Sequence, residues 1–172
     1  MNNHCPMLRK CSTADISEMH AVINDAAIAY KGKIPADCWH EPYMPLSELT
    51  AEIQAGVVFW GHERDDRLLG IMGIQDRGDV TLIRHAYVLT SERNTGIGST
   101  LLRHLETLTS KRILIGTWKA AVWAVSFYRK HGYIQVSEPE KNMLLAQYWT
   151  IGARQIETSV VLVKPAMNAS AP

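Results

Sequence analysis

The first half of the chain carries both helical and extended patterns of apolar positions. Apolar residues at intervals of three and four follow a capping residue at Ser12 or Thr13, which predicts a helix that ends near Gly32. A shorter helix is expected from a cap at Ser47 to Gln54. Apolar runs bounded by turn residues predict strands over Met7–Lys10, Val57–Glu63, Leu68–Gln75 and Val80–Leu89.

The second half alternates strands with helices. One helix opens at Ser99 with leucines on a single face, and another over Ala120–Lys130 ends at the cap pair His131 and Gly132. Further elements are a helix over Glu140–Tyr148 and strands over Arg112–Thr117, Tyr133–Val136 and Gln155–Val163. This order predicts a single α+β domain over residues 1–172, built on one mixed sheet flanked by helices. The small and polar residues 166–172 are expected to form a loose tail.

Composition narrows the possible classes of protein. Of 172 residues, 47% are hydrophobic and 20% are charged, which is typical of a globular protein. Lys and Arg number 18 against 17 Asp and Glu, a net charge of +1, so no nucleic-acid partner is expected. No apolar stretch approaches the roughly 20 residues of a membrane helix, and the first residues do not resemble a signal peptide. Three cysteines at unrelated spacings fit reduced thiols and a cytoplasmic location.

The most informative local motif is the segment Arg93–Gly98, placed between an apolar strand and an amphipathic helix. Its glycine pair allows close approach of the backbone, and the first N–H groups of the helix are then available to an anion. Ser99 and Thr100 follow without the lysine of a nucleoside-triphosphate loop, and Leu101 stands where a dinucleotide fingerprint needs glycine. A plain turn with a glycine-rich helix entry is the alternative.

A second motif decides between these interpretations. Phe127 and Tyr128 lie in the segment Ala124–Tyr133, which has the pattern A-x-x-F-Y-x-K-x-G-[FY]. Together with Val88 and the loop Arg93–Gly98, this segment resembles the GNAT superfamily of acyl-CoA-dependent N-acetyltransferases. The resemblance implies about seven strands in a mixed, mostly antiparallel sheet with helices on both faces.

The resemblance also implies acetyl-CoA, or coenzyme A, as the co-substrate. In the family, loop amides hold the cofactor pyrophosphate and the pantetheine arm pairs with the end of a strand. Ala121 stands where family members often carry an asparagine that fixes the cofactor, and the candidates to compensate are Trp118, Lys119, Trp123 and Ser126. The cofactor-binding residues expected on this basis are Tyr87, Val88, Arg93, Asn94, Thr95, Gly96, Ile97, Gly98, Ser99 and Ser126.

Two residues are expected to move protons. By the resemblance, Tyr128 protonates the departing thiolate, although a core aromatic at the end of a helix is the alternative. Family members often supply a carboxylate on the strand before the loop, but the matching positions are Leu82 and Arg84. His85 is therefore a candidate base; strand alternation sets it on the opposite face from Arg84 unless a bulge brings it round. Glu41 is the other candidate base, and a buried, hydrogen-bonded histidine is the alternative for His85.

The acceptor is expected to bind beside the aromatic residues of the loop Pro35–Pro45. Trp39, Glu41 and Tyr43 would line an amine pocket, and Arg84 either contacts an acidic acceptor or forms a structural ion pair. The loop's Cys, His and Glu are too close together in sequence for a tetrahedral metal site, so no metal is expected.

The sequence thus predicts direct acetyl transfer to a small-molecule or peptide amine, with a homodimer possible because dimers are common in the family. Two alternatives stay open. One is a non-catalytic acyl-CoA sensor on the same fold, which the missing strand carboxylates allow. The other is an unrelated anion- or nucleotide-binding domain.

Overall fold

The computed structural model describes residues 7–166, which divide into two compact units. Within the described range, the first unit contains residues 7–29, 40–76 and 83–109, and the second contains residues 30–39, 77–82 and 110–166. The expectation of a single domain stays a prediction. Apart from Ala166, the predicted tail 166–172 lies outside the described residues.

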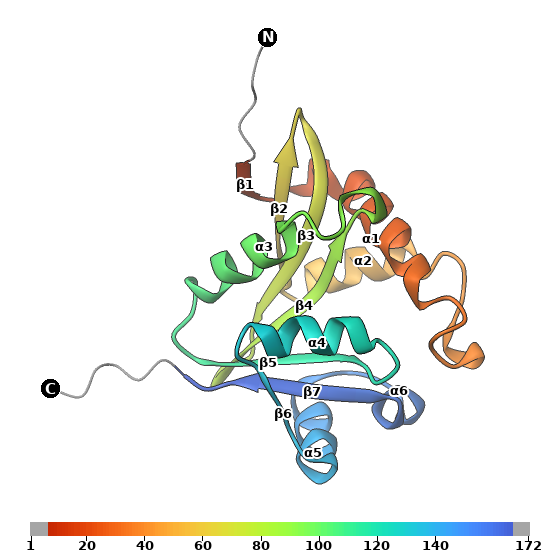
Figure 1. The fold of residues 1–172 in the computed structure, drawn as a ribbon, viewed down its shortest axis with the longest axis vertical. Helices are drawn as coiled ribbons and strands as arrows, with labels where there is room; N and C mark the ends of the chain where they lie inside the picture. Colours follow the sequence, from red (N-terminus) through yellow and green to blue (C-terminus); the bar gives the residue numbers. More distant parts are fainter. Residues whose placement is uncertain (1–6, 167–172) are drawn as a thin grey trace, which may run out of the picture. The chain divides into compact units, whose positions relative to one another are not determined.

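Seven strands of the described chain form one mixed sheet in the order β1-β2-β3-β4-β5-β7-β6 (Figure 1). Pairing is antiparallel for β1 with β2, β2 with β3, β5 with β7 and β6 with β7, and parallel for β4 with β5. The predicted mixed, mostly antiparallel sheet is therefore confirmed. The strands are β1 Met7–Lys10, β2 Val58–Arg64, β3 Arg67–Asp76, β4 Val80–Val88, β5 Arg112–Trp118, β6 Ile134–Gln135 and β7 Ser159–Lys164.

The helices agree with the sequence pattern except at some ends. A short turn capped by Ser12 precedes the first long helix, with Asp15 completing the capping box. The second helix begins at Leu46, with Pro45 rather than the predicted Ser47 at the N-cap, because the carbonyl of Pro45 already accepts from the N–H groups of Glu48 and Leu49. The α-helices are α1 Ile16–Ala27, α2 Leu46–Gln54, α3 Ile97–Glu106, α4 Val122–Lys130, α5 Glu138–Tyr148 and α6 Ala153–Glu157.

The end of the chain differs most from the prediction. The expected strand Gln155–Val163 is divided into helix α6 and strand β7, with Thr158 at the helix C-cap. The hydroxyl of Thr158 donates to the carbonyl of Arg154, which satisfies an acceptor at the helix end. The β-branched residues that suggested a strand therefore form β7 only from Ser159 onwards.

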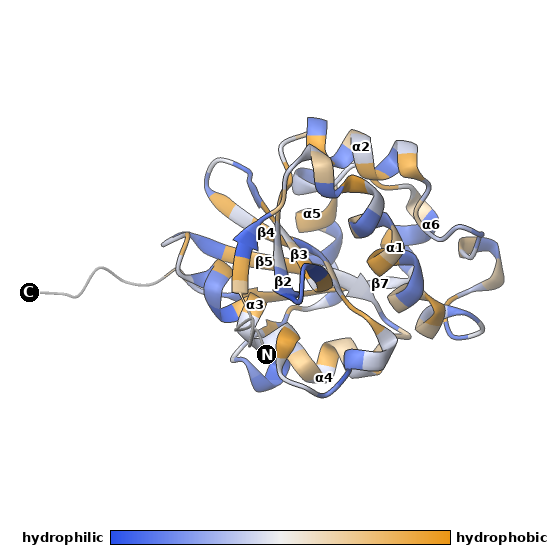
Figure 2. Ribbon diagram, turned by 90° about the horizontal axis from the view of Figure 1, so that it is seen from above, coloured by the Kyte–Doolittle hydropathy of each residue, from blue (hydrophilic) through white to orange (hydrophobic). Residues whose placement is uncertain are grey.

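In the first unit, a tight hairpin and helix α1 organise the core. Asp65 and Asp66 both have positive φ, at 52° and 58°, as a two-residue hairpin turn between β2 and β3 requires. Helix α1 carries both apolar and polar segments along its ribbon (Figure 2), as expected for a helix with one buried face. Its buried residues are Met19, Val22, Ile23, Ala26 and Ala27.

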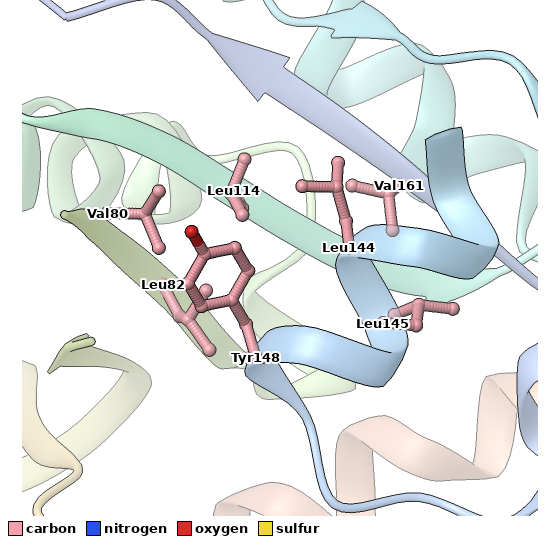
Figure 3. Packing of buried hydrophobic residues seen from close by; sticks show 7 residues of the cluster. All are labelled: Val80, Leu82, Leu114, Leu144, Leu145, Tyr148 and Val161. Atoms are coloured by element: carbon pink, nitrogen blue, oxygen red, sulfur yellow. The ribbon is translucent and has the colours of Figure 1, made fainter. Parts of the chain in front are cut away.

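In the second unit, α5 packs its apolar face on strands of the sheet. Leu144 and Leu145 of α5 meet side chains from β4, β5 and β7, and Tyr148 closes the cluster (Figure 3). The Tyr148 hydroxyl donates to the carboxylate of Asp79 at 2.7 Å, so the one polar atom of the cluster has a partner. The full cluster is Val80, Leu82, Leu114, Leu144, Leu145, Tyr148 and Val161.

Two neighbouring residues of α5 provide a test of this packing. Leu144 is 4% exposed and Met143 is 61% exposed. Leu144→Ala is expected to lower the free energy of unfolding by about 2–5 kcal/mol, because it leaves a cavity in the cluster. Met143→Ala is expected to change it by less than about 0.5 kcal/mol. Urea denaturation measures both; equal losses would contradict the packing described for α5.

Candidate functional site

The loop before α3 has a backbone shaped by two left-handed residues. Asn94 has φ 62° and Gly96, the N-cap of α3, has φ 90°. No side chain caps the helix, which begins at Ile97 rather than at the predicted Ser99. Because the first N–H groups of a helix have no partner within it, this exposed turn is suited to an anion.

The C-terminal end of α1 holds this loop in place. The backbone N–H of Thr90 donates to the Asp25 carboxylate at 2.7 Å. The guanidinium of Arg93 donates to the carbonyl of Ala26 at 3.1 Å, so the Arg93 side chain ties the loop to the end of α1. Within the loop, the Thr95 hydroxyl donates to the Glu92 carbonyl at 2.6 Å. The turn is therefore fixed before any ligand arrives, which lowers the entropy cost of binding.

A glycine of β3 lets the start of α3 pack closely on the sheet. A Cβ atom at Gly70 would lie 2.8 Å from Cγ2 of Ile97, 3.1 Å from Cγ2 of Val88 and 3.2 Å from the carbonyl oxygen of Tyr87. Glycine at position 70 thus lets both the end of β4 and the first turn of α3 pack closely on β3.

Strand β4 is distorted at His85, which has φ 53° in the left-handed region. A bulge of this type interrupts the alternation of side chains along a strand. Arg84 and His85 are consecutive, yet the side chains of both contact the carboxylate of Glu52 in α2. The distortion therefore brings His85 to the side of Arg84.

Glu52 is the centre of a compact polar cluster. Its two oxygens accept from Arg84 Nη1 at 2.8 Å and Nη2 at 3.0 Å, and Nε2 of His85 lies 3.5 Å from Oε2. Nη1 of Arg84 also donates to Gln75 at 3.0 Å, and Gln75 donates to the carbonyl of Ala55. Burial alone raises the pKa of the Glu52 carboxyl, but His85 and Arg84 outweigh it and hold that pKa below its usual value. The carboxylate is consequently ionised at neutral pH.

The predicted acceptor residues are divided between the two units. Trp39 belongs to the second unit, where Nζ of Lys31 lies 6.0 Å from the Trp39 ring centroid. Glu41 and Tyr43 belong to the first unit, where Tyr43 stacks on His40 with ring centroids 6.2 Å apart.

The end of this loop is fastened to α1. The Asn24 side chain donates to the carbonyl of Met44 and accepts from its N–H, both at 3.0 Å. One amide side chain thus satisfies both backbone groups of Met44 and sets where the acceptor loop ends.

Tyr128 lies in the second unit, on α4, and is 5% exposed. Its ring packs edge-on against Phe127 and Tyr133, with centroids 5.1 and 5.8 Å away. Burial raises the pKa of the Tyr128 phenol, so the hydroxyl keeps its proton throughout the physiological range. Ser126, two residues earlier on the same helix, is exposed.

In the described residues, no group of three or more His, Cys, Asp or Glu side chains is placed to hold a metal ion. None of the helices in this part of the chain is long and apolar enough to cross a membrane.

A family model for the acetyltransferase (GNAT) domain matches residues 14–145. This range includes the loop Arg93–Gly98 and the segment Ala124–Tyr133. The chain belongs to the GNAT acetyltransferase family. Members of this family use acetyl-CoA as co-substrate.

Solved structures agree with this assignment at the level of the fold. The PaiA N-acetyltransferase of Thermoplasma acidophilum, solved with coenzyme A, is 19% identical, with a TM-score of 0.72 over 94% of this chain and 99% of that one. A GNAT-family acetyltransferase of Staphylococcus aureus is 16% identical, with a TM-score of 0.69 over 95% and 100%. A ribosomal-protein-alanine N-acetyltransferase of Brucella melitensis is 17% identical, with a TM-score of 0.62 over 92% and 99%. No curated protein matches the chain.

For this GNAT domain, the structure groups some of the residues that the sequence singled out. The loop Arg93–Gly98, the end of β4 and His85 belong to the first unit, whereas Tyr128 and Ser126 belong to the second. Sequence reasoning missed Glu52. Its only signal is an acidic residue in the helix before the strands, which resembles any solvent-facing glutamate.

The close packing at Gly70 leads to a testable prediction. Gly70→Ala is expected to lower the free energy of unfolding by about 1–3 kcal/mol, because the new methyl group overpacks β3 against Ile97 and Val88. Gly152→Ala is the control, since no atom lies within 4 Å of a Cβ there. Urea denaturation of both variants is the measurement, and a loss in Gly70→Ala no larger than in the control would contradict the prediction.

Proposed function

We propose that this GNAT domain transfers an acetyl group from acetyl-CoA directly to a primary amine on a small molecule or a peptide. The observation that carries the proposal is the match of the GNAT domain model over residues 14–145. The preformed turn at Asn94 and Gly96, which leads into the uncapped start of α3, supports it, because this is the backbone shape that an anion such as a pyrophosphate needs.

In this proposal the cofactor lies along the first unit's loop and strand end. Backbone N–H groups of Arg93–Gly98 and Ser99 bind the pyrophosphate. The backbone of Tyr87 and Val88 pairs with the pantetheine arm as an added strand would. Contact between Ser126 of α4 and the cofactor stays a prediction from the sequence. The coenzyme A in the structure of the Thermoplasma protein supports this choice of ligand.

The reaction needs one proton removed and one supplied. His85 takes a proton from the ammonium form of the acceptor, and the freed amine attacks the thioester carbonyl carbon. A C–N bond forms and the C–S bond breaks. The departing thiolate takes the proton of Tyr128, and the tyrosine is restored by the surplus proton of the new amide nitrogen. Burial raises the pKa of the Tyr128 phenol and so keeps it protonated, which leaves a proton available when the thiolate departs.

The acceptor is assigned to Trp39, Glu41 and Tyr43 of the loop Pro35–Pro45, because their two aromatic rings and the Glu41 carboxylate suit a small cation. Contact between Arg84 and an acidic acceptor stays a prediction; its guanidinium is already engaged by Glu52 and Gln75. Cytoplasmic location and a homodimer also stay predictions from the sequence.

Ligand-dependent melting tests the cofactor. At about 100 times its Kd, acetyl-CoA or coenzyme A is expected to add about 2.7 kcal/mol to the free energy of unfolding, which raises Tm by roughly 5–10 °C. ATP and NAD are expected to cause no shift.

A matched pair of glycine variants tests whether the Tm shift with coenzyme A depends on the turn at Gly96. Gly96 and Gly78 are both left-handed, at φ 90° and 84°, and a Cβ at either meets no atom within 4 Å. Gly96→Val is expected to abolish the shift with coenzyme A, and Gly78→Val to keep it. A folded wild-type protein that shifts with ATP but not with coenzyme A would refute the proposal.

Tyr128→Phe tests the proton donor. With an amine that is turned over, thiol release is expected to fall about 10²–10⁴-fold in kcat, while the KM for acetyl-CoA changes little. Tyr133→Phe is the control, because this ring packs against Tyr128 and is equally buried. If acetyl-CoA binds but no amine releases thiol, a non-catalytic sensor of acyl-CoA replaces the proposed enzyme. Full activity in Tyr128→Phe would remove Tyr128 from the mechanism.

A further inference from the structure

The polar cluster in the first unit contains an acidic residue that the proposed reaction does not yet use. Glu52 comes from α2, whereas Arg84 and His85 come from consecutive positions of β4. The left-handed backbone at His85 brings both side chains to the one carboxylate. A left-handed residue other than glycine costs about 1–2 kcal/mol, so the surrounding structure must hold it there.

The carboxylate of Glu52 is held in one orientation. Arg84 binds both of its oxygens in a fork, and Arg84 is in turn held by Gln75, which is 3% exposed. A two-point contact of this kind fixes the plane of the carboxylate as well as its position. The oxygen Oε2 that Arg84 Nη1 contacts is also the oxygen that faces His85.

The imidazole of His85 is largely buried beside the Glu52 carboxylate. Its side chain is 13% exposed, and its ring centroid lies 5.9 Å from that of Phe59 in β2. The nitrogen Nε2 is buried and has no hydrogen-bond partner within the described residues; the acceptor shown near it there is Oε2 of Glu52, 3.5 Å away. In a neutral imidazole one nitrogen carries the proton and the other is the base. A carboxylate facing Nε2 favours the form with the proton on Nε2.

We propose that Glu52 is a positioning residue: its carboxylate, oriented by Arg84, accepts the Nε2–H of His85 and leaves Nδ1 as the nitrogen that takes the proton from the acceptor amine. The proposal rests on the proposed function, in which His85 is the base. Nε2 keeps its proton throughout, and the proton on Nδ1 passes to solvent after the amide has formed. Glu52 stays an anion because it never accepts the proton itself.

Glu52 is a poor candidate for the base. Its carboxyl pKa lies below the usual value, so the carboxylate has little tendency to take a proton from an ammonium group. Both of its oxygens also accept from Arg84, which stabilises the ionised form. A fixed anion beside an imidazole is instead the arrangement that sets a tautomer and stabilises the imidazolium once it forms.

The first experiment reads the tautomer of His85 directly. The full chain, labelled with ¹⁵N-histidine, is studied by NMR at alkaline pH without ligand, and the His85 signals are assigned with His85→Gln. The Nε2–H form is expected in the wild type. Glu52→Gln is expected to increase the Nδ1–H form, because a neutral amide holds Nε2–H less strongly. Glu48→Gln, an exposed glutamate one turn earlier on α2, is expected to leave the tautomer unchanged.

A second variant keeps the proposal testable if Glu52→Gln does not fold. Glu52→Gln leaves Arg84 without its anion, and an unpaired buried charge destabilises a protein. The double variant Glu52→Gln with Arg84→Met removes the pair together and is expected to fold and to lose the Nε2–H preference. The same tautomer in the wild type and in this folded double variant would overturn the proposal.

Kinetics separate this proposal from the one it rests on. With an amine identified by thiol release, Glu52→Gln is expected to lower kcat about 10- to 100-fold with the KM for acetyl-CoA nearly unchanged, while Glu48→Gln behaves as the wild type. Loss of activity in His85→Gln but not in Glu52→Gln would overturn the role of Glu52 and keep His85 as the base. Full activity in His85→Gln would refute the base itself. If no amine is turned over, the proposed function fails, and the NMR result alone decides whether Glu52 orients His85.

Discussion

A β-strand with regular alternation presents neighbouring side chains to opposite faces, and β4 departs from this rule at one residue. His85 adopts φ 53°, a conformation that costs about 1–2 kcal/mol in a residue with a Cβ. A Cβ at Gly73 of β3 would lie 3.0 Å from the carbonyl oxygen of Arg84, so glycine leaves room for the displaced backbone of β4. This distortion places His85 beside Arg84 at the Glu52 carboxylate.

Helix α1 holds two segments that the sequence predicts to bind ligands, and it does so through three consecutive residues. Asn24 binds the backbone of Met44 at the end of the acceptor loop. Asp25 and Ala26 bind Thr90 and Arg93 on either side of the turn before α3. Because one rigid helix end fixes both segments, their relative placement in the first unit is set by the fold, and little ordering is left for the ligands to provide.

Several features were predictable because they depend on local spacing. The helices α1, α3 and α4, the hairpin at Asp65 and Asp66 and the turn at Gly96 all follow from periodicity and from residues with special backbone preferences. The short helix α6 was missed because β-branched residues around Thr158 suit a strand equally well. Periodicity describes the segment that contains a residue. It does not tell which distant segment of the chain will pack against that residue.

The sequence by itself therefore determined the family and the position of the turn before α3, since both depend on motifs of contiguous residues, and the order of its elements predicted the mixed sheet. Tertiary structure alone decided what faces His85 and Arg84. Glu52 is separated from Arg84 by 32 positions, and no spacing rule connects a helical glutamate with a distorted strand so far along the chain. The distance between two charges depends on how α2 packs beside β4, and only the folded chain sets that distance.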